Sequence, residues 1–529
     1  MNCHHCGFDN EANFVLCAHC GRKRVIDLSG GAQTTITQPT PTATGPGTAP
    51  RVAPGTGFAR DATRYLCAAL QLDPGLNDKA LQNILDEDYR AVASSPGVDL
   101  VTVLKYGLAA RRRQLTRDVL IVLLGLIGLG VLASPQPGWA LLVLFAGWAV
   151  MFIETLSTHY GILSAQLRRN AFDPANAPAP TRGRTAARLA DIAARDRGNL
   201  TVFADYAPFA GYGITFGNWS FTLNVAKAEE GKDIVEFTVQ ELRDFVADSV
   251  RGIGLPGVLV EDRVFVSGLD LLHGFEPSVQ QAILPNELAA PASRVDEAVL
   301  GRLHDDPKSR ARPYLTVRVT GWSGELVVTM FLRFALSPQK DLLFVEANYS
   351  LLPPVKRRYQ EVDRLLSSPT FRQLGRLAAM SLIRLVPAVF GGGQRVWAGL
   401  VSPLTRVLKS RREAREITQD RTFNYGATMS LREEAADNRY HRYFQQLDKE
   451  MYAKLAERRV MDALEEFLAD HNVDTSDLSE RQTTILNNGI YVTGHGKLDA
   501  MSVAAGTNAI ARTVTRAART ATPTNNRQG

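Results

Sequence analysis

Cysteine is almost absent beyond the first 20 residues of this 529-residue chain. Four of the five cysteines lie at Cys3, Cys6, Cys17 and Cys20, and the fifth is Cys67. This distribution excludes a disulfide framework for the body of the protein. The first 24 residues are polar and cysteine-rich, so we expect no cleavable signal peptide. The two N-terminal CxxC pairs could form disulfides in a secreted mini-domain, but no secretion signal supports that interpretation.

Catalytic motifs are also scarce. The sequence has no Walker A loop and no GxSxG elbow, which removes the commonest signs of a P-loop nucleotidase or a serine hydrolase. His304-Asp305-Asp306, with His273 upstream, resembles half of an HD phosphohydrolase pattern. A metal-dependent hydrolase needs a denser His/Asp set, so the sequence gives no catalytic residue.

Charge is absent from position 119 to position 153. Two apolar runs of 15 residues, 119–133 and 139–153, flank a segment with two prolines and a glycine, where a helix cannot continue. Each run covers roughly 22 Å as helix, against a hydrocarbon core of about 30 Å, so charged residues at the ends must reach toward the headgroups. We predict a transmembrane hairpin over 117–157, with spans at 118–134 and 138–157. A buried hairpin or a re-entrant loop is the alternative.

Basic residues flank this hairpin on both sides, whereas its central turn has no charge. They are Lys105, Arg111, Arg112, Arg113 and Arg117 before it, and Arg168, Arg169, Arg182, Arg184 and Arg188 after it. The positive-inside rule then predicts a protein of the inner membrane with two spans and both termini in the cytoplasm. The lipid bilayer is its first partner.

The N-terminal cysteines have the spacing CxxC-x10-CxxC, and each pair is followed by glycine. Four thiolates from two facing knuckles form a tetrahedral site that suits Zn²⁺, with His4, His5 and His19 as less favoured ligands. This stretch resembles the short zinc ribbons at the ends of many bacterial membrane and regulatory proteins. The resemblance implies a small module that contacts a protein or a nucleic acid. Because four protein ligands leave no open position, we expect structural Zn²⁺ at Cys3, Cys6, Cys17 and Cys20.

The segments between the ribbon and the hairpin differ in composition. The zinc ribbon covers 1–28, and residues 29–57 are rich in Gly, Thr, Pro and Ala, as expected for a disordered linker. Residues 58–116 have amphipathic helical spacing and are predicted to form a small helical segment that continues into the first span. Cys67 lies on its apolar side and is expected to fill the core.

Beyond the hairpin, residues 196–358 are predicted to form an α+β cytoplasmic domain. The runs 314–320, 325–334 and 342–349 follow one another closely, the first alternates apolar and polar residues over 315–319, and Gly321-Trp322-Ser323-Gly324 suits a hairpin turn, which favours an antiparallel meander. The loop 209–217 is rich in glycine and aromatic residues but lacks GxGxxG, so we interpret it as structural, with a binding loop as the alternative. This region is distantly similar to uncharacterised membrane proteins of actinobacteria, a resemblance that implies no activity.

The helical region 370–475 contains two different patterns. Residues 370–408 alternate apolar residues with arginine and are interrupted by Gly391-Gly392-Gly393. They either lie along the membrane surface or form an ordinary packed helix pair. A long amphipathic helix is predicted at 431–470, which packs on its own domain or associates as a coiled coil with a second copy. Short strands and a disordered tail are expected in 476–529.

The overall composition, 45% hydrophobic and 22% charged with a net charge of +6, suits globular domains beside an anionic membrane. We therefore expect a membrane-anchored cytoplasmic binding, regulatory or scaffold protein with a structural zinc ribbon. The alternatives are an enzyme of unrecognised fold in 196–358, or nucleic-acid binding through the ribbon.

Overall fold

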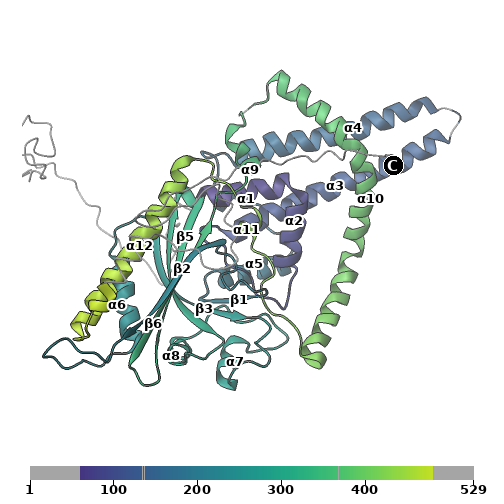
Figure 1. The fold of residues 1–529 in the computed structure, drawn as a ribbon. Helices are drawn as coiled ribbons and strands as arrows, with labels where there is room; N and C mark the ends of the chain where they lie inside the picture. Colours follow the sequence, from purple (N-terminus) through teal and green to yellow (C-terminus); the bar gives the residue numbers. More distant parts are fainter. Residues whose placement is uncertain (1–59, 134, 136, 367, 480–529) are drawn as a thin grey trace, which may run out of the picture. The chain divides into compact units, whose positions relative to one another are not determined.

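The N-terminal part of the described chain is helical and leads into two long apolar helices. The structure is a computed structural model that describes residues 60–133, 135, 137–366 and 368–479 (Figure 1). Helices α1 (Arg60–Leu72) and α2 (Pro74–Ala80) and a π-helical turn (Leu81–Leu85) pack beside α3 (Leu100–Leu132). After a turn, α4 (Ala140–Leu156) returns along α3 and ends in a π-helical segment (Ser157–Ser164).

Helix α3 belongs to two environments. The Asp99 side chain caps it by accepting a hydrogen bond from the Thr102 amide at 3.1 Å, which satisfies one orphan donor of the first turn. Its first half is buried among α1 and α2, whereas its second half exposes large apolar side chains. Helices Leu100–Leu132 and Ala140–Ser164 are both long and apolar enough to cross a bilayer. The structure therefore contains the predicted pair of long apolar helices.

A six-stranded mixed sheet follows α5 (Gly183–Asp196). Its strands are β1 (Leu200–Phe203), β2 (Ile214–Asn224), β3 (Val258–Ser267), β4 (Arg312–Gly321), β5 (Leu326–Leu336) and β6 (Leu342–Leu352), in the order β1-β3-β4-β5-β6-β2. Strand β1 pairs parallel with β3, and every other pair in this sheet is antiparallel. The consecutive strands β4, β5 and β6 form a meander.

Helices cover the sheet with apolar faces. Helix α6 (Val239–Arg251) starts with a capping box between Thr238 and Glu241 and packs with α12 (Tyr443–Asp470) over β4, β5 and β6. Helices α7 (Pro277–Ile283) and α8 (Glu297–Asp305) contribute to a second cluster with β1 and β3. An aromatic cluster, Phe209, Tyr212, Phe265, Tyr314 and Phe331, fills the space beneath the loop that precedes β2.

A 45-residue helix, α10 (Phe371–Arg415), connects the sheet region back to the hairpin. It follows the short α9 (Arg357–Gln360) and precedes the short α11 (Leu431–Glu434). It bends by 49° between its parts Phe371–Leu385 and Pro387–Ser402, where proline removes one helical hydrogen bond. The bent pair also passes the length and composition test for a span, so the described residues hold two such helices, or three if this pair crosses.

Three sequence-based interpretations are revised. The triple glycine at 391–393 stays helical, and the bend lies at Pro387 instead. Strand β2 begins at Ile214, inside the predicted loop 209–217, because its backbone pairs with β6 from Leu351 onward. The long C-terminal helix begins at Tyr443 rather than near 431. The strands expected around 490 and 501 lie outside the described residues.

Candidate membrane interface and ligand cavity

An ion-pair network lies where the uncharged run of α3 begins. Asp118 is only 1% exposed, and its carboxylate accepts from Arg117 Nη2 at 2.8 Å and from Arg395 Nε of α10 at 2.6 Å. Arg117 also lies 3.6 Å from Glu154 of α4, which in turn lies 3.4 Å from Arg113. A buried carboxylate needs such partners to remain charged. The network therefore joins three helices at one end of the hairpin.

Helix α10 crosses both hairpin helices (Figure 1). Trp148 Nε1 of α4 donates to the Ala378 carbonyl at 3.0 Å, and Leu385 lies against Gly147. Past the bend, Gly392 lies beside Asp118 and Val122. The close approach at these glycines resembles the small-residue packing of membrane helices.

Two cavities of opposite character lie along this crossing. An apolar groove of about 510 Å³ separates the outer parts of α3 and α4 from α10, near Leu385 and Val389. A polar cavity of about 390 Å³ lies beside it and is lined by Arg117, Glu154, His159, Arg384 and Arg395, among others. The site therefore changes from apolar to charged over a short distance, as the edge of a bilayer does.

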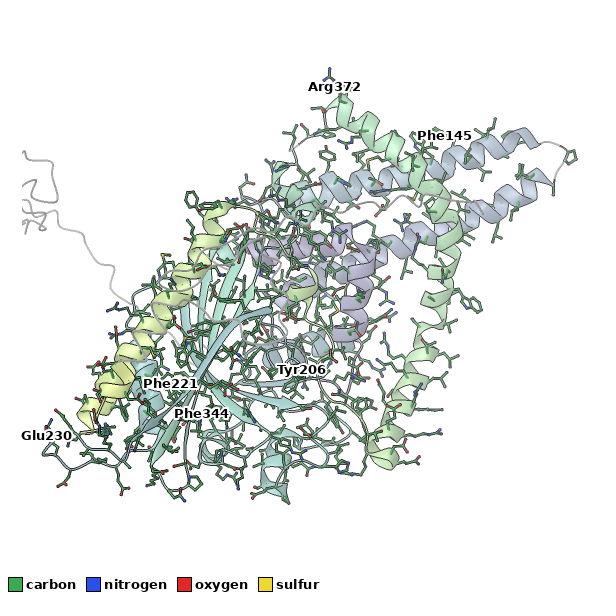
Figure 2. The ribbon with its side chains drawn as sticks, viewed as in Figure 1. Phe145, Tyr206, Phe221, Glu230, Phe344 and Arg372 are labelled. Carbon is green, nitrogen blue, oxygen red and sulfur yellow. The ribbon has the colours of Figure 1, made fainter. Side chains whose placement is uncertain are left out.

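A separate cavity of about 300 Å³ opens beside the loop 204–214 in the sheet region, at the lower end of the usual size of a small-molecule pocket. Much of its lining is small or apolar, with a few polar groups. The lining includes Ala93, Ala204, Asp205, Ala207, Ala210, Ile214, Leu352, Thr428, Ser430, Glu433 and Asn438. Tyr206, the neighbour of Asp205, projects fully into solvent and is labelled in Figure 2.

Glu433 of α11 fixes this loop. Its Oε1 atom accepts from the backbone amides of Gly211 at 2.8 Å and Gly213 at 2.7 Å. Both glycines have positive φ, and a Cβ atom would lie 2.1 Å from the Ser94 carbonyl oxygen at Gly211 and 2.1 Å from that of Leu351 at Gly213. Burial raises the pKa of Glu433, although the two amides oppose the shift. The glycines of the predicted loop thus hold a carboxylate of the chain itself.

The four predicted zinc ligands, Cys3, Cys6, Cys17 and Cys20, lie outside the described residues. Within residues 60–479, apart from the short gaps, no group of three or more His, Cys, Asp or Glu side chains could hold a metal ion. Cys67 is fully buried in α1, and burial raises the pKa of its thiol. A buried, protonated thiol is a poor nucleophile, consistent with a core position.

The histidines of the weak HD pattern have separate partners. His304 Nε2 lies 3.0 Å from Arg243 Nη1 of α6, and its burial, together with that guanidinium, lowers the pKa of His304 to about 4. His273 is exposed and its Nε2 lies 3.0 Å from the Arg421 carbonyl. A cavity of about 300 Å³ is lined by His304 and Asp305 but not by His273 or Asp306. This arrangement does not form the metal pair that an HD site requires.

Sequence reasoning missed Asp118, Arg395 and Glu433. Asp118 directly precedes the uncharged run, and a lone acid at that position is a usable signal of a membrane-edge ion pair. Its partner is 277 positions away, and a single sequence does not show such a pairing. Glu433 is likewise 222 positions from Gly211.

The sequence of residues 218–502 matches the AbeC-like domain family. The match begins within β2, runs through β3 to β6, α6, α10 and α12, and covers neither the hairpin nor the N-terminal cysteines. No curated protein and no solved structure gives a significant match. Because the matched residues make up more than half of the sequence, the chain belongs to the AbeC-like domain family.

Proposed function

We propose that this chain is a membrane-anchored binding protein that holds its AbeC-like domain at the cytoplasmic face of the inner membrane, in a regulatory or scaffold role. The observation that supports this most directly is α3. Its first half forms, with α1, α2 and the segment 81–89 that follows them, a buried cluster that we call the helical base, and its second half is apolar and long enough to enter a bilayer. A helix shared in this way transmits position without a flexible linker. The domain is then held close to the bilayer rather than tethered far from it.

The orientation rests on charge. Arginines crowd the base of the hairpin, where Arg113 and Arg117 join the Glu154 network, whereas the turn near Gly138 is uncharged. The positive-inside rule assigns the basic end to the cytoplasm. The sheet region follows that end.

Cysteine labelling on intact cells tests this topology. Gly138→Cys at the hairpin turn should react with a membrane-impermeant thiol reagent, because this turn would face the outside. Tyr206→Cys, on a fully exposed side chain of the domain, should react only after lysis, and the unaltered chain is the blank. Labelling of Tyr206→Cys on intact cells would refute a cytoplasmic domain.

The cavity beside loop 204–214 is the site we propose for a small ligand of this domain. Its volume of about 300 Å³ and its mixture of small apolar and polar lining residues suit a metabolite rather than a polypeptide. Native mass spectrometry of the intact chain, purified gently from cells, should detect a bound small molecule. The filled variant Ala207→Trp should lose it, whereas Ala289→Trp, outside the cavity lining, should retain it.

Two protein contacts complete the proposal. The zinc ribbon is proposed to bind a protein partner, so a pull-down with the intact chain should lose that partner in the Cys3→Ser/Cys6→Ser variant. Nucleic acid is the alternative partner, and it predicts strongly salt-dependent retention on DNA.

Helix α12 exposes Phe444, Leu447, Met451 and Leu455 at helical spacing in its first half, which supports self-association as the second contact. Phe444→Glu with Met451→Glu should then reduce the mass of the purified assembly.

A further inference from the structure

The second half of α10 carries an apolar stripe that the described protein does not cover. Its members share one helical face at spacings of three and four, and their side chains are between 49% and 72% exposed. They are Trp397, Leu400, Leu404, Val407 and Leu408. We call this face the α10 stripe.

The opposite face of α10 is held against the helical base. Arg406 lies 2.7 Å from Asp86, and Lys409 Nζ lies 2.6 Å from Glu87. Ser410 Oγ lies 3.0 Å from Tyr89 Oη. These contacts fix the rotation of the helix about its axis. The α10 stripe is therefore directed away from the base, except that Trp397 also borders a cavity of about 330 Å³ between α10 and α3.

The stripe begins beside Asp118, the residue of α3 at which the uncharged run of the hairpin begins. Trp397 is two positions beyond Arg395, whose guanidinium pairs with Asp118 at the start of the uncharged run. Asp86 joins the two segments further on, because it lies 3.7 Å from Arg111 of α3 and 2.7 Å from Arg406. The stripe thus accompanies the charged, basal part of α3 and not its apolar part.

Both ends of α10 contact this same basal side. Near its start, Gln373 Oε1 accepts from the Tyr160 hydroxyl at 3.1 Å, and Tyr160 lies beyond Glu154, where the uncharged run of the hairpin has ended. Near its end, Arg406 and Lys409 bind Asp86 and Glu87. A helix that enters and leaves on one side does not cross the bilayer. It lies at the surface or dips into it.

The charge of α10 identifies what covers the stripe. From Phe371 to Arg412 the helix has eight basic residues and no acidic residue. Within the described residues, Arg384 and Arg411 have neither an ion pair nor a hydrogen bond to another side chain, and both are exposed. Arg412 lies 3.0 Å from Glu416 and is also exposed. Arginines beside an apolar stripe with a tryptophan are the features of a helix that lies in a bilayer interface containing anionic lipid.

We propose that α10 is a second membrane contact, which lies in the cytoplasmic leaflet with Trp397, Leu400 and Leu404 among the acyl chains and with Arg411 and Arg412 at anionic phospholipid headgroups. This contact rests on the proposed orientation of the hairpin and adds a surface that the hairpin alone does not supply. Lipid recognition is electrostatic at the arginines and hydrophobic along the stripe. The AbeC-like domain family match includes this helix, so the contact belongs to the domain itself.

Photocrosslinking of the full chain in lipid nanodiscs tests the proposal. The photoreactive residue p-benzoylphenylalanine replaces Leu404 in one sample, Leu126 of the hairpin in a second, and Tyr206 of the domain in a third. Leu126 is a lipid-facing reference and Tyr206 a water-facing one, as both side chains are exposed in their respective regions. We expect lipid adducts at 404 and 126 and none at 206.

Charge variants test the headgroup contact. In nanodiscs that contain phosphatidylglycerol, Arg411→Glu/Arg412→Glu should lower the lipid adduct at 404 by about 25-fold, because each basic residue near an anionic surface contributes roughly 1 kcal/mol, or about fivefold. Arg302→Glu/Lys308→Glu changes the same charge on the exposed surface of the domain and should not lower the adduct. The probe at 126 in the same variants should keep its yield, which verifies insertion and folding.

Each contrary outcome has a definite meaning. No lipid adduct at 404, with a normal adduct at 126, would overturn the α10 contact while leaving the hairpin anchor intact. An adduct at 404 to a second copy of the chain would overturn it in favour of self-association. Equal adduct yields with and without phosphatidylglycerol would overturn the role of the two arginines. Failure of the probe at 126 would instead contradict the anchor on which the proposed function rests.

Discussion

The carboxylate of Glu433 offers a sharp test of how the loop beside the cavity is held. In Glu433→Ala, the backbone amides of Gly211 and Gly213 lose the acceptor that now lies 2.8 and 2.7 Å away. Both glycines have positive φ and lie close against the backbone of Ser94 and Leu351, which leaves no room there for another side chain to replace the carboxylate. The loss should therefore appear as local opening rather than as repacking.

The size of the effect follows from two unsatisfied donors. Leaving a buried polar group without a partner costs roughly 1–3 kcal/mol, so the two amides together make loop opening easier by at least about 2 kcal/mol. A change of 1.4 kcal/mol is a factor of about ten. Exchange of these amides should accelerate by roughly thirtyfold or more, provided that they exchange through local opening.

Hydrogen-exchange mass spectrometry of the full chain in nanodiscs measures this directly. Peptides that cover 209–214 should exchange faster in Glu433→Ala, whereas peptides from β4 and β5 should keep their rates. Glu433→Gln is the matched control, because its side-chain carbonyl keeps the position of the acceptor and should preserve most of the protection. Equal exchange in the wild-type protein and Glu433→Ala would show that the carboxylate does not hold the loop.

Three further predictions concern other parts of the chain. Burial lowers the pKa of His304 to about 4 from an unfolded value near 6.5, so the unfolded state binds more protons between these pH values. The contribution of His304 to the free energy of unfolding should therefore be fully present above pH 6.5 and should fall by about 3 kcal/mol toward pH 4. His304→Gln should flatten this part of the pH dependence of thermal unfolding, and the exposed His273→Gln is the control. Metal analysis should find about one Zn²⁺ per chain. The Cys3→Ser/Cys6→Ser variant should lose this zinc, and the Cys67→Ser variant should keep it. Loss of zinc from the Cys67→Ser variant but not from the double variant would contradict the ribbon. Arg395→Gln should release α10 from Asp118 and increase its cleavage by protease in nanodiscs, whereas Arg384→Gln, which removes no ion pair within the described residues, should not.

Some of this architecture can be predicted from one sequence because its cause is local. The hairpin is visible as a run without charge between 119 and 153, and such a run has few fates other than a bilayer or a buried core. The meander β4-β5-β6 is visible because three short runs, the first with alternating hydropathy, are joined by short turns that specify neighbouring antiparallel strands. In each case the residues that determine the structure are adjacent in the chain.

The rest depends on pairings between distant residues. The glycines at 391–393 stay helical where Gly392 lies beside Asp118 and Val122 of α3, so the bend of α10 lies at Pro387, which lacks a backbone amide. The extension of β2 into the predicted loop follows from the partner strand β6. The pairs Asp118–Arg395 and Glu433–Gly211 join segments more than 200 positions apart, and no local pattern of charge or hydropathy specifies such a register.

Two helices, α3 and α10, attach the sheet region to the proposed membrane anchor, and two attachments restrict how the sheet region can rotate relative to that anchor. Helix α3 joins the hairpin to the helical base, and α10 contacts the hairpin through Arg395 and the core around β1 through Ile417, just beyond its end. A domain on one helix can rotate about that helix, whereas two non-parallel helices linked by an ion pair restrict rotation about either axis. If the α10 stripe also lies in the cytoplasmic leaflet, the same face of the AbeC-like domain always meets the bilayer. A partner at the cavity or at α12 would then encounter the domain from the cytoplasm in one fixed orientation, which is the property that a scaffold at a membrane surface requires.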